Sequence, residues 1–177
     1  MILDWRDAHK DDRRGIQAFR CTTSPPKEPG RRAGPHPKPW EYAVQKAIHQ
    51  LPLPIGDADG RCLIGLAEDG SIGSLSLWCE LRGEPGLFKS QIIAVSLQFR
   101  GTSTDPNQSG PVASEALDVT IEEMTKQGAG GRVFGLIHRS NSASQRLVRT
   151  HGFEVRHDFP VDDPDLQAWV ARLPDGL

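Results

Sequence analysis

Glycine and proline divide this chain into short segments, and that division limits what it can fold into. The 177 residues include 18 Gly and 14 Pro, and both residue types destabilise a helix interior or a central strand. No apolar run approaches the roughly 18 residues that a membrane-spanning helix needs, and no heptad pattern continues far enough for a coiled coil. Apolar segments such as residues 88–99 still indicate a packed core. The sequence therefore predicts one domain over residues 1–177 that has no membrane partner.

Proline is most concentrated near the N-terminus. Residues 23–39 hold six Pro and two Gly among 17 positions, a density that excludes a helix or a central strand and predicts a surface loop. Before it, residues 5–19 show weak helical spacing, with Asp7 as a candidate cap. After it, residues 40–50 form a clearer amphipathic helix.

The remaining chain reads as alternating strands and helices. Strands are expected at 61–67, 72–81 and 88–99, with a short turn joining the first two as an antiparallel hairpin. A second loop at 100–110 leads to a helix at 111–127, where Pro111 suits the first turn. A strand at 132–138, a helix at 141–150 capped by Ser140 or Asn141, and a strand at 166–173 complete a mixed α/β domain.

Charge and cysteine content narrow the function classes. The net charge is −2 and the pI about 6.3, which argues against a basic nucleic-acid binder. Residues 1–40 alone carry nine Lys/Arg against five Asp/Glu, and either a solvated surface or an arm for nucleic acid or another acidic partner fits that excess. Three cysteines without a CxxC pair argue against a disulfide framework or a zinc site. With no signal peptide in view, a reducing cytoplasm is expected.

Two stretches resemble motifs of the GCN5-related N-acetyltransferase (GNAT) family. The strand and turn AVSLQFRG, residues 94–101, are similar to the family's A-V-x-P-x-Y-R-G, which leads into a pyrophosphate loop. The segment NSASQRLVRTHGF, residues 141–153, is similar to N-x-x-A-x-x-L-Y-x-x-x-G-F. The two blocks are separated by one helix and one strand, as in that family. The resemblance covers roughly residues 60–157.

The resemblance implies an acyl-CoA N-acyltransferase fold whose mixed central sheet is splayed between the strands at 88–99 and 132–138. It implies acetyl-CoA as cosubstrate and no metal. Main-chain groups near Val95 and Leu97 would meet the thioester, helix-start amides would bind the pyrophosphate, and Asn141 and Ser144 would contact the pantetheine arm. The full set of expected cosubstrate-binding residues is Val95, Leu97, Arg100, Gly101, Gly110, Val112, Ala113, Ser114, Asn141 and Ser144.

The sequence also departs from the family pattern. The pyrophosphate loop is lengthened and has lost its glycine pair, and Pro111 removes one backbone donor. Val148 stands where many relatives have a tyrosine that protonates the leaving thiolate. Glu80 and His138 are the candidate catalytic acid–base groups. A solvated strand end for Glu80 and a hydrogen-bonded loop histidine for His138 are the structural alternatives.

The function that follows is acetyl transfer to an unidentified primary amine, small molecule or peptide, by direct attack in a ternary complex. The alternative is a GNAT-fold binding or regulatory module with impaired catalysis, which the altered loop and Val148 favour. The sequence allows a homodimer, and nucleic acid is a less favoured partner than an amine acceptor.

Overall fold

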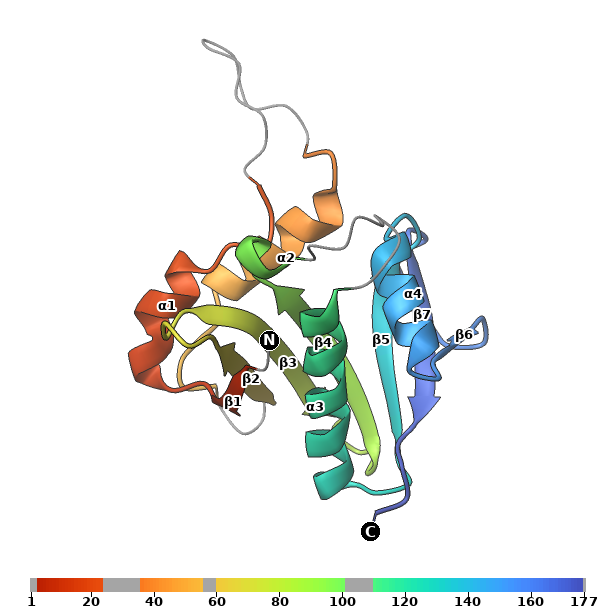
Figure 1. The fold of residues 1–177 in the computed structure, drawn as a ribbon. Coiled ribbons are helices and arrows are strands. Elements are labelled where there is room, and N and C mark those ends of the chain that lie inside the picture. The colour runs from red at the N-terminus through yellow and green to blue at the C-terminus, as the bar shows by residue number, and fades with distance from the viewer. Residues whose placement is uncertain (1–2, 24–35, 56–59, 101–109, 177) are drawn as a thin grey trace.

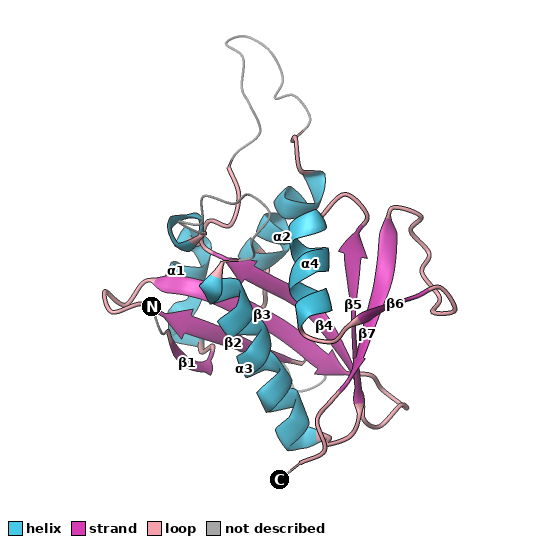
Figure 2. Ribbon diagram, turned by 45° about the vertical axis from the view of Figure 1, so that its right-hand side comes forward, coloured by secondary structure: helices cyan, strands magenta, loops and turns pink. Residues whose placement is uncertain are grey.

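The computed structural model describes residues 3–23, 36–55, 60–100 and 110–176. In these residues seven strands form one sheet in the order β1-β2-β3-β4-β5-β7-β6, and helices cover both of its faces (Figures 1 and 2). The strands are β1 (Asp4–Asp7), β2 (Arg61–Leu66), β3 (Ile72–Glu80), β4 (Leu87–Val95), β5 (Arg132–His138), β6 (Glu154–Arg156) and β7 (Leu166–Arg172). The helices are α1 (Arg13–Ala18), α2 (Pro39–His49), α3 (Pro111–Gln127) and α4 (Ser142–Thr150), with 3-10 turns η1 (Lys10–Asp12) and η2 (Leu97–Phe99).

The expected elements from residue 40 onward are confirmed, with ends that move by a few residues. The helix at 111–127 and the strand at 132–138 have the expected bounds. The strand expected at 88–99 ends at Val95, and a 3-10 turn takes its last residues. Pro111 occupies the first turn of α3, Asn141 caps α4, and Gly152 closes α4 with a positive φ of 79°. Each of these helix ends follows from the residue type that stands there.

The start of the chain corrects the expectation of a helix over residues 5–19. Residues 4–7 form β1, which pairs antiparallel with β2, and only residues 13–18 are α-helical. Glu115 of α3 anchors this edge, because its carboxylate accepts hydrogen bonds from the Leu3 amide and the Trp5 indole, both at 2.9 Å. Asp7 is therefore a strand residue and caps no helix; its carboxylate pairs with Arg61 at 2.9 Å.

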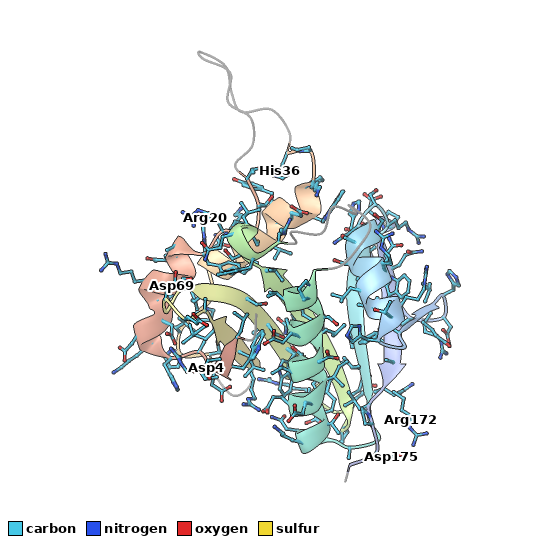
Figure 3. The ribbon with its side chains drawn as sticks, viewed as in Figure 1. Asp4, Arg20, His36, Asp69, Arg172 and Asp175 are labelled. Atoms are coloured by element: carbon cyan, nitrogen blue, oxygen red, sulfur yellow. The ribbon has the colours of Figure 1, made fainter. Side chains whose placement is uncertain are left out.

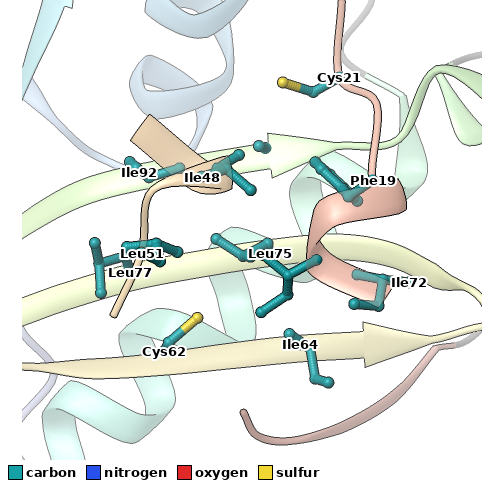
Figure 4. Packing of buried hydrophobic residues seen from close by; sticks show 12 residues of the cluster. Phe19, Cys21, Ile48, Leu51, Cys62, Ile64, Ile72, Leu75, Leu77 and Ile92 are labelled. Carbon is teal, nitrogen blue, oxygen red and sulfur yellow. The ribbon is translucent and has the colours of Figure 1, made fainter. Parts of the chain in front are cut away.

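The two largest of the three hydrophobic clusters in the described residues lie on opposite faces of the sheet. On one face α1 and α2 pack against β2, β3 and β4, and the close-up in Figure 4 shows Phe19, Ile48 and Leu75 meeting there. On the other face α3 and α4 cover a core built around Trp78, Phe88 and Trp169. The sheet therefore separates the α1/α2 side from the α3/α4 side. Among the described residues, none of the helices combines the length and the apolar character required to cross a membrane.

Candidate active site

β4 and β5 part near the centre of the sheet, next to a β-bulge of β4 against β3, and the space between their diverging ends is called the opening below. The two strands pair in parallel only from Leu87↔Arg132 to Ser90↔Gly135. Beside that last pair, the register of β4 against β3 jumps from Trp78↔Ser90 to Leu77↔Ile92, so Gln91 is an extra residue in β4. A bulge bends its strand and increases its twist. Beyond Gln91 the ends of β4 and β5 diverge, as Figure 1 shows, and the expected splay is present.

The bulge also decides which main-chain groups of β4 face the opening. The Ser96 amide donates to the Gly73 carbonyl at 2.9 Å, so residue 96 faces β3. Because antiparallel pairing alternates along a strand, Ala94 also faces β3, whereas Ile93 and Val95 direct their N–H and C=O groups toward the opening. Leu97 differs from the expectation: its amide donates to the Arg20 carbonyl at 2.8 Å, and its carbonyl accepts from Arg100 at 3.3 Å (Figure 3 labels Arg20). The main-chain groups of Val95 thus face the opening, whereas the N–H and C=O of Leu97 already have partners.

The start of α3 faces the same opening. Pro111 carries no N–H, and the amides of Ala113 and Ser114 already donate to the Gly110 carbonyl at 3.0 and 3.4 Å. Of the three amides expected to meet a pyrophosphate, only that of Val112 has no acceptor within the described chain. A helix N-terminus still favours an anion through its exposed donors and its dipole. Gly101 and residues 102–109 lie outside the described residues.

Ser114 joins α3 to α4 through a histidine. The Oγ of Ser114 lies 3.1 Å from Nε2 of His151, and Asp118 Oδ1 lies 3.2 Å from the same nitrogen. The other ring nitrogen lies 2.8 Å from the Leu147 carbonyl. Because serine and aspartate share one nitrogen, the three residues do not form a nucleophilic triad, in which the carboxylate holds the opposite ring nitrogen. The group instead fixes α3 beside α4.

Asn141 and Ser144 form a reciprocal cap at the start of α4. The Ser144 amide donates to Asn141 Oδ1 at 3.2 Å, and Asn141 Nδ2 donates to Ser144 Oγ at 2.8 Å. The cap holds both expected pantetheine-contacting residues in one fixed arrangement at the end of β5. In the described chain these two hydrogen bonds hold both side chains, and their contact with pantetheine stays a prediction.

Asn141→Ala is expected to lower the free energy of unfolding by about 1 kcal/mol, because it removes this cap from α4. Asn141→Asp keeps an acceptor oxygen and should stay within about 0.5 kcal/mol of the parent chain. Urea denaturation measures both, and Ser142→Ala, an exposed first-turn change, serves as the control. An unchanged midpoint for Asn141→Ala would contradict the capping role.

His138 lies at the tip of β5 beside the opening, as expected for a site residue. Its Nδ1 accepts a hydrogen bond from the Ser140 amide at 3.1 Å, so the neutral ring carries its proton on Nε2. Its ring also stacks on Trp40 of α2, with centroids 4.5 Å apart. In this state His138 presents a donor rather than a basic nitrogen. His138 thus offers a hydrogen-bond donor to the opening, and its catalytic role stays a prediction.

Glu80, the other catalytic candidate, is not brought to the opening, and that expectation is corrected. It pairs with Phe88 at the closed end of the sheet, seven residues before Val95 on β4. At about 3.3 Å per residue the two positions lie roughly 23 Å apart along the strand. Its Oε1 accepts a hydrogen bond from the Gly86 amide at 2.6 Å. Glu80 thus stabilises the turn between β3 and β4.

The cysteines supply no nucleophile at this site. Burial raises the pKa of Cys21 to about 11 and that of Cys62 to about 12, so both thiols are protonated at neutral pH. Cys79 Sγ accepts a hydrogen bond from Gln91 Nε2 at 3.1 Å, across from the bulge. Within the described ranges, no cluster of three or more His, Cys, Asp or Glu side chains is arranged to hold a metal ion.

Sequence reasoning missed the residues that reach the opening from α2. Glu41 forms an ion pair with Arg100, with Glu41 Oε2 and Arg100 Nη1 3.0 Å apart. Arg100 follows β4 directly, so this ion pair joins α2 to the chain that leaves β4. Its guanidinium, expected to meet the cosubstrate, is held by Glu41 in this structure. The two residues lie 59 positions apart, and no local pattern signals their contact.

Comparison with known structures gives the class of fold. The chain has the fold of the GNAT acetyltransferases. A GNAT-family acetyltransferase from Staphylococcus aureus Mu50 matches with a TM-score of 0.64 and 10% identity, covering 97% of this chain and 99% of that chain. A phosphinothricin acetyltransferase of the GNAT superfamily from Sinorhizobium meliloti, solved in complex with acetyl-CoA, matches with a TM-score of 0.62 and 18% identity over 99% and 91% of the two chains.

Ard1 from Thermoplasma volcanium matches with a TM-score of 0.61 and 11% identity over 99% of this chain and 100% of that chain. No protein-family model matches the sequence, and no curated protein matches it. The likeness is therefore one of fold across the whole chain. The residues of the opening, and not sequence identity, carry the functional argument.

Proposed function

We propose that this chain is a divergent GNAT acetyltransferase that transfers an acetyl group from acetyl-CoA to a primary amine. The observation that carries the proposal is the divergence of β4 and β5 beyond the bulge at Gln91, with the first turns of α3 and α4 beside it. Two of the solved structures named above are GNAT acetyltransferases, and one of these two was solved in complex with acetyl-CoA. The fold alone does not determine an activity, so the proposal depends on the groups at this opening.

The pantetheine arm and the diphosphate of acetyl-CoA each have a candidate partner in the described chain. The outward main-chain groups of Ile93 and Val95 would pair with the extended pantetheine arm as an additional strand does. The Val112 amide, which has no acceptor within the described chain, and the α3 dipole favour the diphosphate. The Nε2–H of His138 would donate to an oxygen or sulfur atom that reaches the tip of β5.

The reaction needs little covalent help from the protein. The amine nitrogen attacks the thioester carbonyl carbon, the C–S bond breaks, and the coenzyme leaves as a thiolate. Holding both reactants in one complex supplies a large part of the rate enhancement, and acid–base assistance adds about 10²–10⁴-fold. Val148, packed beside the α3/α4 core, has no proton to give, so solvent would protonate the thiolate.

Titration calorimetry with acetyl-CoA tests the binding half of the proposal. A dissociation constant in the micromolar range is expected, because an extended arm, a helix N-terminus and an aligned strand edge all contribute. No heat at millimolar acetyl-CoA would reject both binding and catalysis. Thiol release with a panel of primary amines then separates the enzyme from the alternative of a binding or regulatory module. Binding without turnover of any amine would favour the module.

A further inference from the structure

The first turn of α2 reaches both sides of the opening. Trp40 stacks on His138 at the tip of β5, and the next residue, Glu41, pairs with Arg100 just beyond the end of β4. Successive helix residues point about 100° apart, which allows one turn to span the gap. Figure 1 shows α2 lying across the ends of these strands. The carboxylate of Glu41 is thereby placed on the α1/α2 side of the opening, opposite α3 and α4.

Glu41 is an ionised and largely enclosed carboxylate. Its side chain is 16% exposed, and it accepts hydrogen bonds from Lys38 Nζ and Thr22 Oγ1, both at 3.1 Å. Burial would raise its pKa, but Arg100 and Lys38 outweigh that effect and hold the pKa below its usual value. Beyond Thr22 lies His36, whose Nε2 is 3.2 Å from Thr22 Oγ1 (Figure 3 labels His36). Among the described residues, the charged groups that touch the Glu41 carboxylate are Arg100 and Lys38.

The two cations on Glu41 differ in what they show. The ammonium of Lys38 demonstrates that a primary amine can reach Oε1 from solvent, because that side chain is 56% exposed. Arg100 is 36% exposed and stands at the position that, by the family resemblance, opens the pyrophosphate loop. Guanidinium groups bind phosphate oxygens in charge-assisted pairs. Lys38 therefore resembles the amine that would be acylated. Arg100 could exchange Glu41 for another anion, a phosphate of acetyl-CoA.

We propose that the Glu41–Arg100 ion pair is a latch, and that Glu41 is the group which receives the acceptor's ammonium. The proposal rests on the proposed function. A phosphate of acetyl-CoA takes Arg100, and Glu41 loses one of its cations. The acceptor's ammonium then binds Glu41 and transfers one proton to the carboxylate. The free amine attacks the thioester carbonyl carbon, the C–S bond breaks, and the coenzyme leaves as a thiolate that solvent protonates. The amide nitrogen gives its second proton to solvent, and Glu41 then releases its own proton to solvent. The acceptor class is a primary ammonium that approaches along α2.

Acetyl-CoA binding alone tests the latch, without any acceptor. Glu41→Gln frees Arg100 and is expected to tighten acetyl-CoA binding by up to about 5-fold, the range of a partly exposed ion pair. Arg100→Met is expected to weaken it by about 10-fold through loss of a charge-assisted contact. In the Arg100→Met background, Glu41→Gln should have no further effect. Lys46→Met, which removes a cation of α2 that does not contact Glu41, is the matched control.

Turnover tests the ammonium-binding role. The probes are benzylamine, spermidine and a dipeptide amide with a free amino-terminus, followed by thiol release at saturating acetyl-CoA. Glu41→Gln should lower kcat/KM for each reactive probe by about 10²-fold or more, while Glu41→Asp, which keeps the charge, restores part of it. Melting curves of the variants show whether the fold is retained.

The outcomes separate the two levels of the proposal. If the parent chain binds no acetyl-CoA, the proposed function fails and the latch fails with it. If the parent chain binds and turns over while Glu41→Gln behaves identically in both assays, only the latch is overturned. Tighter acetyl-CoA binding together with loss of turnover in Glu41→Gln is the expected combination. A purely structural role of Glu41 would weaken both.

Discussion

Ser114→Asp is expected to weaken acetyl-CoA binding by at least about 50-fold while leaving the fold intact. Two like charges about 7 Å apart repel by about 2.4 kcal/mol at an effective dielectric constant near 20, and the diphosphate carries more than one charge. Within the protein, the new carboxylate meets two favourable groups that offset its repulsion with Asp118, whose Oδ1 lies 3.2 Å from Nε2 of His151. It lies in the first turns of α3, where an acidic group is favoured, and beside Nε2 of His151, which lies 3.1 Å from the present hydroxyl.

This pairing of effects makes the variant diagnostic. Ser114→Asn has nearly the same size without the charge, and it should bind acetyl-CoA within about 3-fold of the parent chain. Titration calorimetry measures binding, and thermal melting checks that the Asp variant is as stable as the Asn variant. If Ser114→Asp binds acetyl-CoA as the parent chain does, the diphosphate does not lie at the start of α3.

The parts of the site that follow from local chemistry were visible in the sequence. Asn141 caps α4 because an acceptor side chain stands just before a helical stretch, and Pro111 begins α3 because its missing N–H costs nothing there. The family resemblance predicted that β4 and β5 diverge, but it did not predict the bulge beside which they part. The bulge at Gln91 depends on how β3, β4 and β5 register against one another, and a single strand sequence does not encode that register.

The residues that sequence reasoning misplaced were decided by long-range partners. Residues 4–7 are polar and short, and they become a strand because β2 and Glu115 offer hydrogen bonds there. Glu80 looked like a catalytic carboxylate until the direction of β3 put it at the closed end of the sheet. An acidic residue is favoured in the first turn of any helix, so Glu41 in α2 gives no functional signal by itself. Only its contact with Arg100 sets it apart.

Phe88→Ala is expected to lower the free energy of unfolding by about 3–5 kcal/mol, the usual cost of removing a fully buried aromatic ring. Phe88 is 0% exposed and lies in the short paired stretch where β4 still contacts β5. Its ring meets Trp78 edge to face, with centroids 5.8 Å apart. Leu97→Ala, a change at a side chain that is 39% exposed, should cost less than about 1 kcal/mol and serves as the control.

Gly128 at the end of α3 provides a compensating partner that tests the packing directly. A Cβ at Gly128 would lie 2.8 Å from Phe88 Cε2, so Gly128→Ala should destabilise the parent chain. In the Phe88→Ala background that methyl group enters the vacated space, and the same change should become neutral or stabilising. Urea denaturation of the four chains gives the coupling energy, and strictly additive effects would contradict this contact.

Because β4 and β5 are joined only at this end, a loosened Phe88 contact should also widen the opening. Acetyl-CoA affinity should then fall in the single variant and recover in the double variant.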